Sequence, residues 1–162
     1  MTPSVRVLGI DPGTNVTGYG VVERVNGIPG RLVECGIIRT NPGRPLWHKL
    51  NAVHDGVVQL IDKYQPNTLA IESVFYAKNV RTTIVLAHAR GVILLAAAQA
   101  GLDVAEFPPA TIKKTIVGTG GAAKKQVAYM VRQLLNLKTP PEPSDAADGV
   151  AVALTFLLTS KA

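Results

Sequence analysis

Strand-like segments open this chain, and helical segments become more frequent after them, which limits the fold to a sheet covered by helices. Val5–Ile10 is a short apolar run that ends at Asp-Pro-Gly, a sequence typical of turns. Gly18–Val25 and Leu32–Arg39 are rich in β-forming residues, and the glycines and proline between them predict a hairpin or meander. The chain is therefore expected to begin with three strands.

Strands and helices alternate in the next part of the chain. The apolar residues of Leu46–Tyr64 recur at helical spacing, and short apolar strands are predicted at Thr68–Glu72 and Asp103–Phe107. A long helix is expected at Asn79–Ala100, between those two strands. Three more helices are predicted, at Thr111–Val117, Ala122–Leu135 and Ser144–Thr159. This order predicts an α/β fold with a mixed five-stranded β-sheet flanked by helices on both faces.

The length of 162 residues fits a single domain that spans residues 1–162. Because 47% of the residues are apolar and 17% are charged, an intrinsically disordered chain is excluded. The single cysteine, Cys35, has no partner for an internal disulfide, which fits a reducing compartment. We therefore expect a cytoplasmic protein.

One stretch, Ile84–Leu102, is apolar enough to raise the question of a membrane span. His88, Arg90 and Gln99 interrupt it, and an arginine near the centre of a bilayer costs about 2.5–3.5 kcal/mol. We interpret this stretch as a helix buried in protein and expect no membrane association.

Positive charge is concentrated in one part of the chain. Residues 78–138 carry nine Lys or Arg and two acidic residues, a local net charge of +7, whereas the rest of the chain has a net charge of −1. A generally basic and soluble surface would instead scatter this charge. The concentration favours a polyanionic partner such as a nucleic acid.

Four of the eleven acidic residues lie at the ends of predicted elements. Asp11 follows the first strand and Glu72 closes the fourth, and ligands of open α/β sheets bind at the carboxyl ends of strands. Asp145 and Asp148 are three residues apart in the first turn of the last helix, so they share a face. Taken alone, this pair could simply stabilise the helix N-terminus. The alanines between them and the following Gly149 leave room for close packing against a sheet.

Four converging carboxylates would repel one another unless a divalent cation held them together. Carboxylate oxygens without a Cys/His cluster favour Mg²⁺, or Mn²⁺ as an alternative, over zinc. The histidines, His48, His54 and His88, are scattered, and we interpret them as surface or core residues. Two metal ions about 3.5–4 Å apart can promote hydrolysis of a phosphodiester, and the basic stretch would neutralise its phosphates.

A series of different short motifs is distributed over nearly the whole chain. They are Gly9-Ile10-Asp11-Pro12-Gly13, Thr17-Gly18-Tyr19-Gly20, Ile71-Glu72-Ser73-Val74-Phe75-Tyr76-Ala77-Lys78-Asn79, Ala89-Arg90-Gly91, Lys113-Lys114-Thr115-Ile116-Val117-Gly118, Lys124, Gln126-Val127 and Asp145-Ala146-Ala147-Asp148. In this order and spacing the chain resembles the RuvC family of bacterial Holliday-junction resolvases, which have a ribonuclease H-like fold.

The resemblance implies a homodimeric endonuclease that resolves four-way (Holliday) DNA junctions by paired symmetric nicks and works with the RuvA and RuvB branch-migration proteins. It also implies that four acidic residues hold two Mg²⁺ ions in each site, with Asp11 bridging them. These are Asp11, Glu72, Asp145 and Asp148.

The resemblance further implies DNA-binding roles for Lys113, Lys124 and Phe75, with the ring of Phe75 stacking on a base. The residues themselves leave other roles open, because lysines can belong to solvated faces and an aromatic ring can fill a gap between a helix and the sheet. The neighbouring Tyr76 is an alternative stacking residue. The apolar helix at Asn79–Ala100 is a candidate dimer interface, and Trp47 is expected in the core or in an interface.

The same residues are compatible with three other functions. A nuclease for RNA–DNA hybrids would use the same sheet and carboxylates. An actin-like ATP-binding module is a second alternative, because Gly9–Thr14 resembles the first phosphate loop of such proteins, although those need two such domains around a cleft. A DNA-binding protein without catalysis is disfavoured because all four acids are present.

Overall fold

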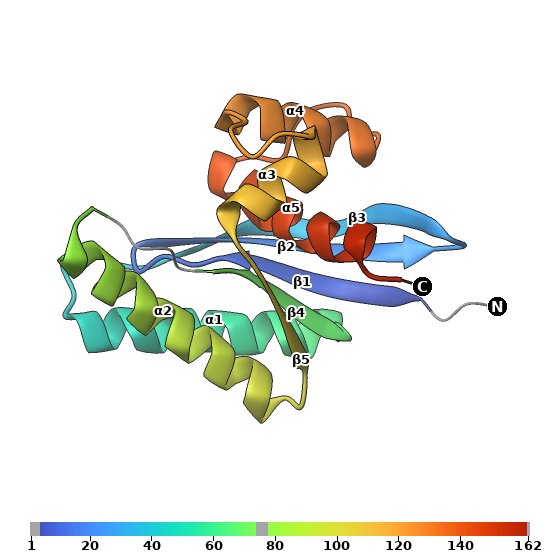
Figure 1. Ribbon diagram of the computed structural model, residues 1–162. Coiled ribbons are helices and arrows are strands. Elements are labelled where there is room, and N and C mark those ends of the chain that lie inside the picture. The colour runs from blue at the N-terminus through green and yellow to red at the C-terminus, as the bar shows by residue number, and fades with distance from the viewer. Residues whose placement is uncertain (1–3, 74–77, 162) are drawn as a thin grey trace.

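The computed structural model describes residues 4–73 and 78–161 and contains one mixed sheet with the strand order β3-β2-β1-β4-β5 (Figure 1). Strands β1, β2 and β3 pair antiparallel, whereas β4 and β5 run parallel to β1. The bounds are β1 Val5–Asp11, β2 Val16–Val25, β3 Ile28–Arg39, β4 Thr68–Glu72 and β5 Asp103–Phe107. Because β1 and β4 are parallel neighbours, their last residues lie at the same edge of the sheet.

Helices cover both faces of the sheet (Figure 1). Helices α1 and α2 lie on one face, and α3, α4 and α5 lie on the other. Their bounds are α1 Leu46–Tyr64, α2 Val80–Gln99, α3 Pro109–Val117, α4 Lys124–Leu134 and α5 Ser144–Thr159. The predicted α/β class and mixed five-stranded sheet are confirmed.

Strand β1 divides the core in two, because successive side chains of a strand point to opposite faces. Leu8 and Ile10 belong to the core beneath α1 and α2, whereas Val7 belongs to the core shared with α3, α4 and α5. Gly9 lies against α5. By the same alternation, Asp11 belongs to the face that α5 covers.

The predicted bounds differ from the structure at a few ends. Strand β3 begins at Ile28 instead of Leu32, because Asn26 and Gly27 adopt positive φ angles of 52° and 78° and close a tight hairpin. Both central residues of a type I′ hairpin turn need positive φ, and Asn-Gly is the preferred sequence for it. Helix α3 begins at Pro109, where proline is tolerated because the first N–H groups of a helix have no intrahelical partner.

The expectation that the apolar helix is buried in protein was wrong for most of its surface. Only 22% of the apolar window of α2 is buried, although Ala89 and Ile93 are fully covered. By length and composition alone, α2 could cross a membrane, and it is the one such helix among the described residues. Arg90 interrupts it with a largely buried side chain that pairs with Glu106 at 2.5 Å. Trp47 is 69% exposed and therefore does not belong to the core.

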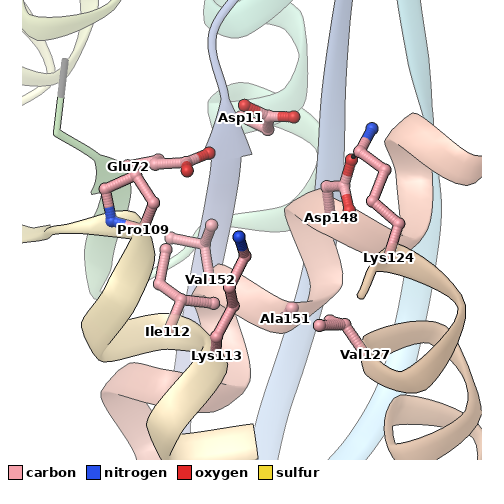
Figure 2. A pocket seen from close by; sticks show the side chains of 10 residues that line it. All are labelled: Asp11, Glu72, Pro109, Ile112, Lys113, Lys124, Val127, Asp148, Ala151 and Val152. Carbon is pink, nitrogen blue, oxygen red and sulfur yellow. Dashed lines mark ion pairs between the residues drawn. The ribbon is translucent and has the colours of Figure 1, made fainter. Parts of the chain in front are cut away.

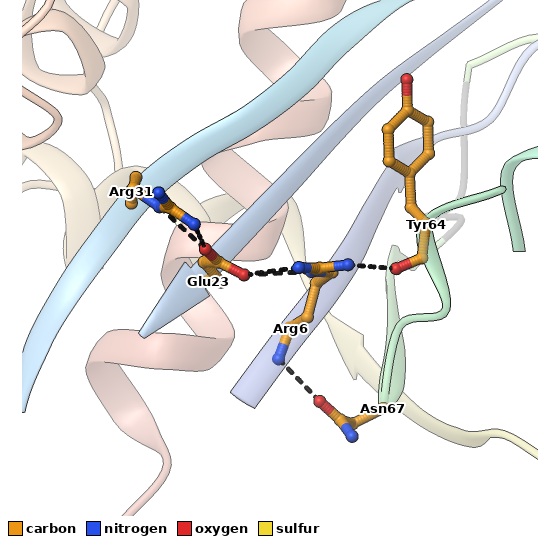
Figure 3. A network of polar contacts seen from close by, with 5 residues as sticks. All are labelled: Arg6, Glu23, Arg31, Tyr64 and Asn67. Carbon is orange, nitrogen blue, oxygen red and sulfur yellow. Dashed lines mark hydrogen bonds and ion pairs between the residues drawn. The ribbon is translucent and has the colours of Figure 1, made fainter. Parts of the chain in front are cut away.

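A polar network ties the strands together at the end of the sheet opposite Asp11 (Figure 3). Glu23 is 2% exposed and accepts hydrogen bonds from Arg6 Nε and Nη2, at 3.0 and 2.9 Å, and from Arg31. Arg6 Nη1 also donates to the carbonyl oxygen of Tyr64 at 2.6 Å, and the Arg6 N–H donates to Asn67 Oδ1 at 2.7 Å. The network thus joins β1, β2 and β3 to the connection between α1 and β4.

Replacing Glu23 by glutamine should destabilise the protein near neutral pH. Burial alone would raise the pKa of Glu23, but the hydrogen bonds and charges of Arg31 and Arg6 outweigh it, so the pKa is lowered. A carboxyl with a lowered folded-state pKa stabilises the fold above its unfolded-state pKa, and this contribution is lost as the pH falls through the folded-state pKa. Urea unfolding at neutral pH should therefore show that Glu23→Gln lowers the free energy of unfolding by about 2 kcal/mol.

The same measurement in acid should show a smaller difference between this variant and the wild type. Glu106→Gln is the control, because the Glu106 side chain is 52% exposed and an exposed ion pair contributes about 1 kcal/mol or less. Equal stabilities of Glu23→Gln and wild type at neutral pH would show that the network is not stabilising.

Candidate active site

Glycines allow α5 to lie against the sheet at backbone contact distance. A Cβ atom at Gly18 would lie 1.8 Å from the carbonyl oxygen of Asp145, and one at Gly9 would lie 2.3 Å from that of Gly149. A Cβ atom at Gly149 would in turn lie 2.5 Å from Tyr19 Cα. These contacts place the first turn of α5 beside the end of β1, as the small residues around Asp145 led us to expect.

The four predicted acids meet at this edge. Carboxylate oxygens of Asp11, Asp145 and Asp148 lie within 4.8 Å of one another. Glu72 lines the same cavity as Asp11 and Asp148, close enough to raise the pKa of Asp11. Figure 2 shows Glu72 and Asp148 on either side of Asp11. Three separate segments of the chain therefore contribute carboxylates to one site.

The site disfavours the ionised form of its central residue. Burial, the neighbouring carboxyl of Glu72 and the charge of Asp148 together raise the pKa of Asp11 to about 9. The ammonium of Lys124 opposes them. A cation among these oxygens would relieve the repulsion, and a donor set of carboxylates suits a hard divalent ion. The residues present thus fit the predicted metal.

Both predicted DNA-binding lysines lie at the acidic cavity, which has a volume of about 300 Å³. Lys113 comes from α3, and Lys124 comes from the first turn of α4 with its Nζ 2.9 Å from Asp148 Oδ2 (Figure 2). Apolar side chains from α3, α4 and α5 complete the wall: Ile112, Val127, Ala151 and Val152. The cavity thus combines carboxylates that could hold a cation with lysines of the kind that contact DNA phosphates.

The predicted stacking residue, Phe75, and the alternative Tyr76 lie outside the described residues.

Sequence reasoning missed Thr17 and the apolar wall of the cavity. Thr17 is fully buried, and its hydroxyl donates to the Gly13 carbonyl oxygen at 2.7 Å and accepts from the Gly13 N–H at 3.3 Å. These bonds close the turn that follows Asp11. A threonine four residues after the glycine of an Asp-Pro-Gly turn could have indicated this, because short hydroxyl side chains satisfy backbone groups in turns.

The family model described as "Crossover junction endodeoxyribonuclease RuvC" matches residues 7–156, a range that includes all four acids and both lysines. The chain belongs to the RuvC family. RuvC of Pelotomaculum thermopropionicum is 47% identical over 148 residues, which cover 91% of this chain and 90% of the relative. RuvC of Halorhodospira halophila is 50% identical over 149 residues, with coverages of 92% and 87%.

A solved RuvC structure is similar over almost the whole chain. T. thermophilus RuvC in complex with a Holliday junction substrate matches with a TM-score of 0.87 at 35% identity, covering 94% of this chain and 92% of that chain. This similarity confirms the predicted ribonuclease H-like fold. Membership of the RuvC family does not favour the ATP-binding alternative, nor a nuclease for RNA–DNA hybrids.

Proposed function

We propose that this RuvC-family protein is a metal-dependent endonuclease that resolves four-way DNA junctions by paired symmetric nicks. The observation that carries the proposal is the convergence of carboxylates from β1, β4 and α5 in one cavity that also contains Lys113 and Lys124. Its support in the family is the T. thermophilus relative, which was solved with a Holliday junction substrate.

Asp11, Glu72, Asp145 and Asp148 are proposed to hold two Mg²⁺ ions, with Mn²⁺ as the alternative. When bound, such ions activate water and stabilise the leaving oxygen during in-line hydrolysis of a phosphodiester. The protein's own part is to hold the four carboxylates together by the packing of α5 on β1 and β2, and to keep one wall of the cavity apolar.

Lys113 and Lys124 are proposed to bind the phosphates that flank the cleaved bond, because their side chains line the same cavity as the acids. Phe75, which lies between Glu72 and Lys78 in the sequence, is proposed to stack on a base at the centre of the junction. In the sequence it follows Glu72, the last residue of β4, by three positions.

Paired nicks need two active sites, and we place the homodimer contact on α2. Ile84, His88, Gly91 and Leu95 are exposed and follow the heptad spacing of a helix that packs against another helix. Apart from the backbone of its own helix, none of the described residues lies within 4 Å of where a Cβ atom of Gly91 would be. A glycine inside a helix costs about 1 kcal/mol relative to alanine, and here it would allow a partner helix to approach closely.

Because the chain belongs to the RuvC family, we also propose that it works with RuvA and RuvB and is located in the cytoplasm.

Leu95→Asp should convert the dimer to a monomer. Leu95 is 51% exposed in the single chain, so a charge there leaves the fold intact but would be desolvated in the dimer. Sedimentation equilibrium should show dimerisation weakened by about tenfold or more, which is 1.4 kcal/mol. The control is Leu134→Asp, since Leu134 is 38% exposed and lies on α4. A Leu95→Asp protein that dimerises like the control would move the interface away from α2.

Nick mapping tests the function as a whole. The protein is incubated with Mg²⁺ and a synthetic four-way junction, a plain duplex or an RNA–DNA hybrid. We expect symmetric nicks in two opposing strands of the junction, and no cleavage once EDTA removes the metal. Preferential cutting of the hybrid would support the alternative nuclease, and cleavage that persists in EDTA would contradict the metal requirement.

A further inference from the structure

Lys124 makes an ion pair inside the acidic site. Its Nζ lies 2.9 Å from Oδ2 of Asp148, whose side chain is 18% exposed. Among the ion pairs of the described residues, this is the one that involves any of the four acids. One ammonium therefore provides the direct counter-charge to the carboxylates.

Lys124 pairs directly with Asp148, and the charges of the other aspartates act on it as well. Its close contact with Asp148 raises the pKa of Lys124 against a smaller opposing effect of burial, and the charges of Asp148, Asp145 and Asp11 raise it further. The same ammonium lowers the pKa of Asp11. Lys124 thus performs, with one charge, part of the neutralisation that a divalent cation would perform with two.

The side chain of Lys124 can move without a change in the backbone. It is 68% exposed, and Lys124 is the first residue of α4. Gln126 Oε1 accepts a hydrogen bond from the Ala123 N–H at 2.8 Å, which secures the start of the helix. The four-carbon stem of a lysine can then carry the ammonium from one oxygen to another nearby.

We propose that Lys124 is an exchangeable counter-ion. In the metal-free protein its ammonium pairs with the carboxylate of Asp148. When a divalent cation binds that carboxylate, the ammonium is released and can bind a DNA phosphate. This inference rests on the proposed function, because it requires a cation among the acids. The carboxylate that pairs with the ammonium, Asp148, is also one of the three clustered acids that could hold a cation, so the two would compete for it. Since coupling between two ligands is reciprocal, cation binding then strengthens DNA binding, and DNA strengthens cation binding by the same factor.

Metal titration without DNA tests the competition. Mn²⁺ binding is measured by calorimetry for wild type, Lys124→Met and Lys125→Met. Methionine keeps the length of the side chain and removes the charge. Lys125 is the matched control because it is exposed, follows Lys124 in the same helix and is not among the residues that line the cavity. We expect Lys124→Met to bind Mn²⁺ about fivefold more tightly than wild type, and Lys125→Met to change the affinity by less than about twofold.

Salt dependence of junction binding tests the release of Lys124. DNA affinity falls as salt rises, and each lysine–phosphate contact makes the plot of log affinity against log salt concentration steeper by about 0.9. With Ca²⁺ as the probe cation, the salt dependence of junction binding should be steeper for wild type than for Lys124→Met, by about one in the magnitude of the slope. In EDTA the two slopes should agree, because Lys124 is then engaged by Asp148.

The outcomes separate this inference from the proposed function. If wild type bound no Mn²⁺, the metal-dependent function itself would fail. If wild type and Lys124→Met bound Mn²⁺ equally, or if Lys124→Met bound it more weakly, the metal site would stand and the exchange would be overturned. Slopes that differ equally with and without Ca²⁺ would also overturn it, because Lys124 would then bind phosphate at all times.

Discussion

Asp11→Asn is expected to lower the nicking rate by about 10³-fold or more while junction binding is retained, because several kcal/mol of transition-state stabilisation depend on correctly held cations. Asp11 links the four carboxylates: it shares a cluster with Asp145 and Asp148 and a cavity with Glu72. Asparagine has nearly the same shape but offers a neutral oxygen, so the variant tests charge and not packing. Single-turnover nicking of a labelled junction measures the rate, and a gel-shift titration measures binding.

The metal-free stability of this variant provides a second, independent result. Because the folded-state pKa of Asp11 is raised, the folded protein binds a proton that the unfolded chain releases above the ordinary pKa of aspartate. The stability of the wild type in EDTA should therefore fall as the pH rises from the ordinary pKa of aspartate towards about 9. Asp11→Asn should remove this decline and be at least as stable as wild type at neutral pH.

Asp55→Asn is the control for both measurements, because the Asp55 side chain is 60% exposed on α1 and lies outside the acidic site. It should leave nicking and stability close to wild type. Undiminished cleavage by Asp11→Asn would remove Asp11 from the mechanism, whatever the stability data showed.

The position of Asp11 and Glu72 could be predicted because it follows from local rules. Each residue ends an apolar run, and parallel neighbouring strands end at the same edge of a sheet. The alternation of side chains along β1 then decides which face Asp11 occupies. Asp145 and Asp148 needed one further assumption, that the last helix packs closely on the sheet, which the alanines between them and Gly149 indicated.

Other features could not be predicted because they depend on contacts between distant segments. Gly9 and Gly18 are required by the backbone of α5, which lies more than a hundred residues further along the chain. The exposure of α2 is a second case, since apolar composition does not reveal whether a helix packs on its own sheet or leaves its apolar side chains exposed for contact with another molecule. Nor does the sequence show that Lys124, and not Lys113, pairs with Asp148.

Gly18→Ala is expected to lower the free energy of unfolding by about 3 kcal/mol or more, the upper range for overpacking in a core. A methyl group at Gly18 would lie 1.8 Å from the carbonyl oxygen of Asp145, and both the strand and the helix backbone would have to shift. Because α5 carries Asp145 and Asp148, the shift would also open the acidic cluster. Mn²⁺ affinity, measured at a temperature where the variant is still folded, should fall by at least about tenfold.

The control for this last change is Gly43→Ala, where the added Cβ atom would meet Asn41 Oδ1 at an ordinary 3.4 Å, and which should stay within about 0.5 kcal/mol of wild type. A Gly18→Ala protein that unfolds early yet binds Mn²⁺ normally would show that the acids do not depend on the contact between α5 and β2. One that matches wild type in both measurements would mean that the helix does not lie against the strand backbone at all. The joint loss of stability and metal affinity is what connects the glycines of β1 and β2 to the chemistry of the site.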